Sequence, residues 1–133
     1  MMRIGDKKII PITFNQNQVI KFAEITGDNN PLHLDDEYAK KTIFKKKIIH
    51  GLLSGSIFSK IFGTIFPGRG SIYLEQSFIF KKPMYINEKY NVILTIKLLD
   101  KEKHIVTLKT QIFDSLNNLT IDGEAKILNE KIH

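Results

Sequence analysis

The chain has 133 residues, a net charge of +6 and no cysteine, which suits one folded unit and excludes disulfides, thiolate catalysis and cysteine-based zinc sites. Its 42% hydrophobic and 26% charged residues are typical of a globular protein. No apolar run is long enough to span a membrane, because the nearest one, residues 51–66, contains Lys60 and several small polar residues.

The positive charge comes almost entirely from lysine, since Arg3 and Arg69 are the only arginines. Proteins that read a nucleic-acid sequence usually depend on arginine, whereas a basic surface also suits a small polyanion such as coenzyme A. The opening residues 1–6 carry a charge too early for a secretory signal. We therefore expect a cytoplasmic protein with no nucleic-acid and no membrane partner.

The first predicted elements are a strand over residues 8–14 and a helix that follows it. Asn15 and Gln18 have the spacing of a capping box, and apolar residues then recur at helical spacing up to Thr26. Gly27 is well suited to end this helix in a left-handed conformation. We found no repeat or linker, so we expect one undivided domain over residues 1–133.

Two further helices are predicted before the chain turns to strands. Residues 27–31 read as a loop, and the acidic run at 35–37 predicts the start of a short helix that ends near Thr42. Residues 51–66 are apolar or small on nearly every side, which predicts a helix with neighbours all around it, ended by Pro67.

The second half of the chain has the two-residue period of strands. It alternates from Ser71 until Pro83, and three further strands are predicted over residues 90–99, 105–113 and 119–128. The short polar turns between them favour antiparallel pairing. The prediction is an α+β hotdog fold, a curved antiparallel sheet wrapped around one long buried helix.

The densest group of reactive side chains lies in the predicted loop and just after it. Asp28 and His33 are five residues apart, and Pro31 between them restricts the backbone. A carboxylate and an imidazole that share one water molecule can orient it and take its proton. The same residues also fit an ordinary turn followed by a packed histidine, and spacing alone leaves both interpretations open.

Four segments of the sequence resemble the MaoC-like family of enoyl-CoA hydratases. They are residues 22–35, with the core Asp28-Asn29-Asn30-Pro31-Leu32-His33, and residues 48–53, 58–63 and 67–74. They occur in the family's order, and the resemblance as a whole extends over nearly the whole chain. The catalytic positions show no departure from the family's pattern.

The resemblance implies a reaction and its residues. Asp28 and His33 would activate a water that adds across a trans-2-enoyl thioester to give an (R)-3-hydroxyacyl thioester, with no cofactor and no metal. The backbone N–H of Gly51, at a helix N-terminus, would stabilise the enolate oxygen, although a tight turn would also explain a glycine there. Ser59 would line the substrate pocket, or would only permit close packing. A His33–Asp35 metal site lacks a third ligand.

Several rival functions fit the sequence less well. Thioesterases and acyl-carrier-protein dehydratases of this fold generally carry an acid on the central helix, and residues 51–66 contain none. A non-catalytic subunit that binds acyl thioesters needs neither Asp28 nor His33, and a DNA-associated regulator needs a further helix-turn-helix. Because an isolated hotdog exposes a sheet edge, we expect a homodimer. Acyl-chain length and the carrier, coenzyme A or acyl carrier protein, stay open.

Overall fold

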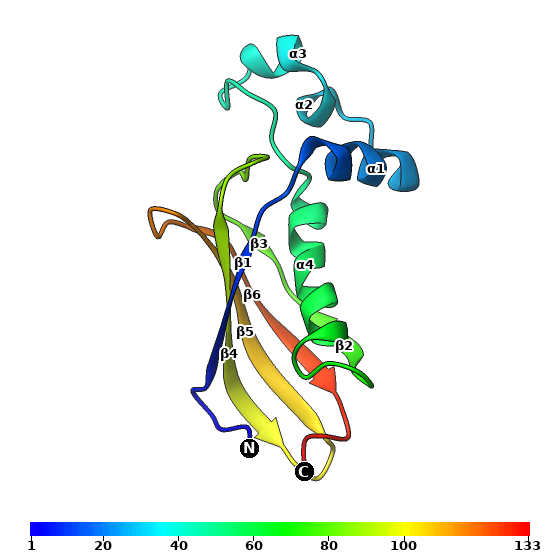
Figure 1. Ribbon diagram of the computed structural model, residues 1–133, viewed down its shortest axis with the longest axis vertical. Coiled ribbons are helices and arrows are strands. Elements are labelled where there is room, and N and C mark those ends of the chain that lie inside the picture. Colours follow the sequence, from blue (N-terminus) through cyan, green and yellow to red (C-terminus); the bar gives the residue numbers. More distant parts are fainter.

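The computed structural model describes residues 1–133 as one antiparallel sheet with helices at one end and along one face (Figure 1). The sheet order is β1-β4-β5-β6-β2, and the short β3 also pairs with β6. The strands are β1 (Lys7–Ile12), β2 (Ile72–Gln76), β3 (Ile79–Phe80), β4 (Tyr90–Asp100), β5 (Ile105–Asp114) and β6 (Leu119–Leu128).

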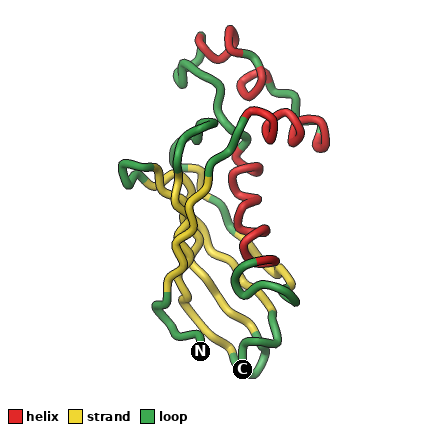
Figure 2. The backbone as a smooth tube through the Cα atoms, viewed as in Figure 1, coloured by secondary structure: helices red, strands yellow, loops and turns green.

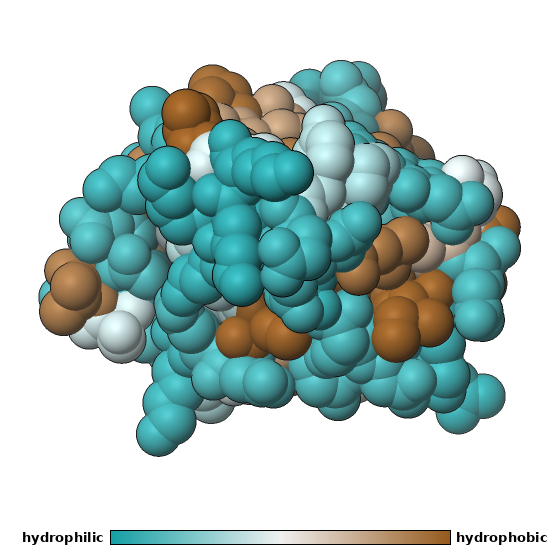
Figure 3. Space-filling model, turned by 90° about the horizontal axis from the view of Figure 1, so that it is seen from above, coloured by the Kyte–Doolittle hydropathy of each residue, from teal (hydrophilic) through white to brown (hydrophobic).

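The helices divide into two groups. Three shorter ones gather beyond one end of the sheet, and the longest runs alongside the sheet (Figures 1 and 2). They are α1 (Gln16–Thr26), α2 (Pro31–Leu34), α3 (Asp36–Lys40) and α4 (Gly51–Thr64). None of them combines the length and the apolar character that a membrane crossing requires. Seen from the end that carries α1 to α3, the surface is mostly hydrophilic with separate hydrophobic side chains (Figure 3).

The core lies between α4 and the sheet. Phe58, Ile61 and Phe62 of α4 are buried against alternate residues of the strands, such as Val92 and Leu94. Burying each such side chain contributes about 1.5–3 kcal/mol, so this contact fixes where the N-terminus of α4 lies. The predicted α+β arrangement, a curved antiparallel sheet around one long helix, is present.

Several local predictions are confirmed. Asn15 and Gln18 form a capping box at the start of α1, and Gly27 ends that helix with φ 77° in the left-handed region. The strands predicted over residues 90–99, 105–113 and 119–128 lie within one residue of those observed.

The segment after Gly27 contains two short helices where one was predicted. The side chain of Asn30 accepts a hydrogen bond from Leu32 N, and Pro31 takes the first helical position, so α2 begins four residues before the acidic run. The side chain of Asp35 then caps α3 by accepting from two backbone N–H groups.

The alternating run predicted between Ser71 and Pro83 is broken into β2 and β3 at Ser77. The Ser77 carbonyl crosses so close to Gly123 of β6 that a Cβ there would lie 2.0 Å from the Ser77 oxygen. Ser77 N donates to Glu124 O at 2.9 Å, and Glu124 N donates to the Ser77 hydroxyl at 3.0 Å. This crossing bends the strand away from regular pairing.

The prediction that the long helix has neighbours on all sides is wrong for the single chain. Leu52, Ser56, Ser59, Lys60, Gly63 and Thr64 form an exposed stripe at helical spacing. The sheet covers one face of α4, and no second layer of this chain covers the other.

Candidate active site

The loop that carries Asp28 is held by hydrogen bonds between near neighbours. Asp28 N donates to the Thr26 hydroxyl at 3.2 Å, and Asn30 N donates to Asp28 Oδ1 at 3.3 Å. Asn30 in turn caps α2 through its bond from Leu32 N at 3.1 Å. This chain of short turns presents the Asp28 side chain at the surface of the site while its backbone stays fixed.

His33 is buried and oriented by one strong contact. Its side chain is 8% exposed, and ring Nδ1 lies 2.7 Å from the carbonyl oxygen of Ile48. A carbonyl can only accept, so Nδ1 carries a proton and donates it. In the neutral ring Nε2 therefore keeps a free lone pair, which is the form that a base needs.

Asp28 and His33 lie together with a third residue, His50. One ligand atom from each of the three residues lies within 4.8 Å of the other two. The carboxylate of Asp28 is exposed, whereas both imidazoles are buried. The predicted pair is thus within reach of one water molecule, as acid–base chemistry requires.

From the sequence, His50 was expected only to hydrogen-bond the turn before Gly51, and its place in the site was missed. Its ring lies 3.9 Å from the ring of His33, centre to centre, and 4.7 Å from that of Phe22. Its Nε2 donates to the backbone oxygen of Asp28 at 3.2 Å, and its buried Nδ1 has no partner. Burial, aided by the nearby His33, lowers the pKa of His50 below its ordinary value, so the ring is neutral at pH 7.

His50 also changes the argument about a metal. It supplies the third potential ligand that the sequence lacked, next to Asp28 and His33. The two imidazole rings, however, overlap at an interplanar angle of 31°. Rings stacked this closely pack against each other, and His50 Nε2 already donates to the backbone oxygen of Asp28. The absence of a metal stays a prediction.

The N-terminus of α4 opens onto the same place. Ser54 N makes the first bond of the helix, to His50 O, so the N–H groups of Gly51, Leu52 and Leu53 have no acceptor within the chain. His50, the residue before the helix, provides no side-chain cap. Free N–H groups and the helix dipole together favour an anionic or partly anionic oxygen at this point.

Gly51 also packs closely against the side chain of Phe80. A Cβ on this residue would lie 2.8 Å from Cε1 of Phe80, closer than real side chains come. Gly51 has no positive φ, so the close neighbour is a side chain and the tight-turn alternative is not supported. The donor role of its N–H remains compatible with the geometry and stays a prediction.

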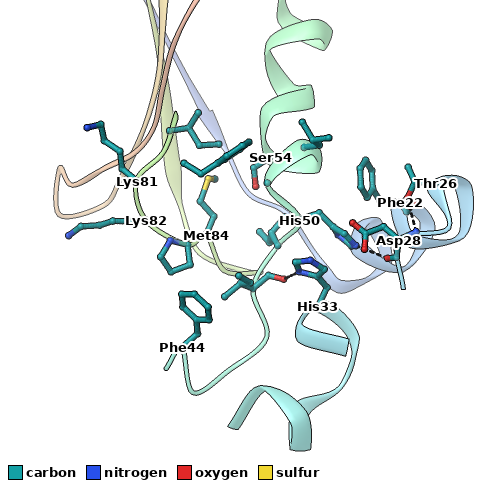
Figure 4. Close-up of a pocket in the computed structure, with 17 residues that line it drawn as sticks. Phe22, Thr26, Asp28, His33, Phe44, His50, Ser54, Lys81, Lys82 and Met84 are labelled. Carbon is teal, nitrogen blue, oxygen red and sulfur yellow. Dashed lines mark hydrogen bonds between the residues drawn. The ribbon is translucent and has the colours of Figure 1, made fainter. Parts of the chain in front are cut away.

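A cavity of about 590 Å³ connects these groups (Figure 4). This volume falls in the range of small-molecule sites, and the cavity wall is largely apolar. It brings Asp28, His33 and Gly51 together as the sequence predicted. Its other lining residues are Phe22, Thr26, Phe44, Ile48, Ile49, His50, Leu52, Ser54, Phe80, Lys81, Lys82, Pro83, Met84 and Ile121.

Ser59 does not line this cavity. It is exposed on α4, in a separate shallow depression beside Tyr73 and Leu74 of β2. The α4 serine in the cavity is Ser54, because residues three apart, such as Gly51 and Ser54, share a face of a helix. Within one chain, the expectation that Ser59 is a pocket residue is therefore not met.

Comparison with known proteins agrees with this geometry. Residues 4–113 match the family model described as MaoC like domain. The chain belongs to the MaoC-like family. It is 38% identical to an (R)-specific enoyl-CoA hydratase of Aeromonas caviae, over 95% of this chain and 94% of that protein. It is 36% identical to a mitochondrial 3-hydroxyacyl-[acyl-carrier-protein] dehydratase of Arabidopsis thaliana, over 94% and 76% of the two chains.

Solved structures of the MaoC-like family share the fold. The (R)-hydratase from A. caviae involved in PHA biosynthesis superposes with a TM-score of 0.91 over 96% of this chain and 97% of that one. An R-hydratase from Pseudomonas aeruginosa, 34% identical, superposes with a TM-score of 0.90 over 96% and 82%. The predicted hotdog fold is confirmed, and relatives with curated names are hydratases and dehydratases, which are hydro-lyases.

Proposed function

We propose that this protein is an (R)-specific enoyl-CoA hydratase, which adds water reversibly to a trans-2-enoyl-CoA to give an (R)-3-hydroxyacyl-CoA. The observation that carries the proposal is the position of Asp28 and His33 beside one another at an apolar cavity onto which a helix N-terminus opens. The relatives named as (R)-specific hydratases support the same reaction.

The geometry supports a division of labour between the two residues. The Asp28 carboxylate and the free Nε2 of His33 would both contact one water, one group taking its proton as the oxygen attacks the β-carbon. The proton taken up is then available for delivery to the α-carbon. Both groups lie on one side of the cavity, so the new C–O and C–H bonds form on one face of the alkene.

Negative charge moves onto the thioester oxygen during this attack. The free N–H of Gly51 at the start of α4 is the group that we assign to that oxygen. The arrangement needs neither a metal nor an organic cofactor, because the thioester itself makes the β-carbon electrophilic.

The carrier of the acyl group is coenzyme A in this proposal. Lys81 and Lys82 line the cavity and are exposed, which suits the phosphates of a carrier that stay outside. Acyl carrier protein is the second candidate carrier, because the Arabidopsis relative is named as a 3-hydroxyacyl-[acyl-carrier-protein] dehydratase. Turnover of a crotonyl group on coenzyme A and on acyl carrier protein, compared at equal concentration, distinguishes the two.

We also propose a homodimer that covers the β2–β3 edge of the sheet. Leu74 is 44%, Ile79 56% and Phe80 51% exposed there, and β2 lies at the end of the strand order. Leu52, 61% exposed, belongs both to the cavity and to the Ser59 depression, so a second copy on this edge would border both. One domain over residues 1–133 and a cytoplasmic location stay predictions of the sequence.

The test of the function is a spectrophotometric hydration assay with crotonyl-CoA and longer enoyl-CoAs. We expect loss of the conjugated enoyl absorbance without added metal or cofactor, and no effect of a chelator. Light scattering on the same sample tests the assembly. A monomer mass with full activity would refute the dimer, and no turnover of any enoyl thioester would refute the hydratase.

A further inference from the structure

Ser54 differs from the other serines and threonines of the helices. The hydroxyls of Thr26, Ser56 and Thr64 each donate to a backbone carbonyl about one turn earlier, at 2.6–2.7 Å. Ser59 is exposed and can bind solvent. Ser54 is 1% exposed, and its Oγ has no hydrogen-bond partner.

The unpartnered hydroxyl faces the cavity beside the free N–H groups of α4. Ser54 lies one turn after Gly51 on the same helix face, and both residues line the cavity (Figure 4). Side chains of a helix tilt toward its N-terminus, which directs the Ser54 hydroxyl toward the turn that begins at Gly51. The rest of this part of the wall is apolar, formed by Phe80, Met84 and Ile121.

A buried hydroxyl without a partner destabilises the free protein, and alanine would be the better helix former at this position. The hydroxyl is therefore best explained by a hydrogen bond that forms when a ligand is bound. An acceptor placed at the N–H of Gly51 is within one helical turn of Ser54, and no other polar side chain of α4 lines the cavity.

We propose that the Ser54 hydroxyl is a second donor, beside the Gly51 N–H, to the carbonyl oxygen of the enoyl thioester. This inference rests on the proposed hydratase function. The serine keeps its proton and forms no covalent bond. Its hydrogen bond strengthens as water adds to the β-carbon and negative charge gathers on the thioester oxygen, so it stabilises the transition state more than the bound substrate.

The kinetic test compares three variants with crotonyl-CoA as substrate. Ser54→Ala removes the donor, Ser54→Cys keeps the side-chain size but offers only a weak donor, and Ser56→Ala makes the same chemical change on the exposed face. We expect kcat to fall roughly ten- to several-hundred-fold in Ser54→Ala and nearly as far in Ser54→Cys, with KM changed by less than about threefold. Ser56→Ala should match the wild type.

Two measurements without turnover separate a donor from a packing residue. The melting temperature of ligand-free Ser54→Ala should rise by a few degrees, because an unpartnered hydroxyl has been removed. In an Asp28→Asn background, the infrared carbonyl stretch of bound crotonyl-CoA, labelled at the carbonyl carbon, should lie at higher frequency when Ser54 is alanine, because the carbonyl is then less polarised.

The outcomes are distinct. Wild-type kcat in Ser54→Ala, with active wild-type protein, would overturn the inference and leave the hydratase proposal intact. A loss of kcat seen only with acyl chains that carry an additional oxygen would also overturn the inference, because Ser54 would then bind that oxygen. A loss of kcat with a lower melting temperature and an unchanged carbonyl frequency would overturn it too, because Ser54 would then be a packing residue. If the wild-type protein hydrates no enoyl thioester, the function and the role of Ser54 fall together.

Discussion

The loop of residues 26–34 and the first turns of α4, residues 50–54, face the same cavity but are held in different ways. The loop is fixed by hydrogen bonds between residues two apart, and its carboxylate is exposed. The start of α4 is fixed by packing, with His50 against His33 and Gly51 against Phe80. The Asp28 carboxylate is thus held by a locally built loop, whereas His33 and the start of α4 are held by contacts with distant residues.

This difference has a consequence for substitutions. A change at Asp28 removes an exposed group and should reduce activity with little change in the free energy of unfolding. A change at Gly51 or His50 disturbs a packing contact and should alter both activity and stability. The predictions below test this contrast, beginning with the largest expected effect.

Asp28→Asn should have the largest effect, a fall in kcat of at least about a hundred-fold, because an amide cannot take the proton of water. The amide oxygen can still accept from Asn30 N, so the melting temperature should stay within about two degrees of the wild type. Steady-state kinetics and thermal melts measure the two quantities. Glu24→Gln, on the exposed side of α1, is the charge-matched control and should leave both unchanged.

If folded Asp28→Asn kept more than about a tenth of the wild-type turnover, Asp28 would be a turn residue and not a base.

His33→Gln should also reduce kcat by at least about a hundred-fold, since Nε2 is lost. Because Asp28 and His33 act on one water, the double variant should lose far less than the product of the single losses. A double-mutant cycle on kcat measures this coupling. If the loss of kcat in the double variant equalled the product of the two single losses, the residues would act independently, and the proposal of one shared water would be wrong.

Gly51→Ala should lower kcat by roughly ten-fold or more and also destabilise the fold by about 1–3 kcal/mol, because its Cβ meets the ring of Phe80. Gly63→Ala is the matched control on the same helix, where a Cβ meets nothing within 4 Å. It should raise stability by up to about 1 kcal/mol and leave kcat unchanged. Equal behaviour of the two variants would show that the packing at Phe80 is not tight in solution.

The smallest effect is a pH dependence of stability that comes from His50. Its pKa is lowered in the folded protein, so the unfolded chain binds a proton first as the pH falls below about 6.5. The stabilisation that neutral His50 provides is complete above that pH and is lost as the pH falls toward the folded pKa. His50→Phe, a ring that does not titrate, should show a flatter stability curve between pH 7 and 5 in thermal melts.

The other three histidines are present in both proteins, so the difference between the two curves comes from His50 and its contact with His33. A variant curve as steep as that of the wild type would mean that His50 is not the titrating group.

Much of the molecule could be predicted from local sequence. The capping box at Asn15, the left-handed Gly27 and the three long strands depend on neighbouring residues or on a regular period, and all three were predicted correctly. Asp28 and His33 could be predicted because the family's motif is continuous along the chain. The motif can be recognised without knowing which residues pack against it.

The features that were missed depend on contacts between distant segments. The break at Ser77 arises where its carbonyl crosses Gly123 in another strand, and nothing within residues 71–82 marks it. The burial of His50 against His33 and the choice of Ser54 over Ser59 as the cavity serine depend on how α4 is rotated against the sheet. Sequence period cannot fix that rotation when a helix is apolar on nearly every side.

The stereochemistry of the product is the most direct test of the account. The protein is incubated with crotonyl-CoA, the thioester is hydrolysed, and the enantiomers of 3-hydroxybutyrate are separated on a chiral column, with Asp28→Asn protein as the blank. With Asp28 and His33 on one side of the cavity, we predict one predominant enantiomer from the wild type and neither from the variant. We expect that enantiomer to be (R), in line with the names of the (R)-specific relatives. Predominantly (S) product, or a racemate formed at wild-type rate, would contradict the account.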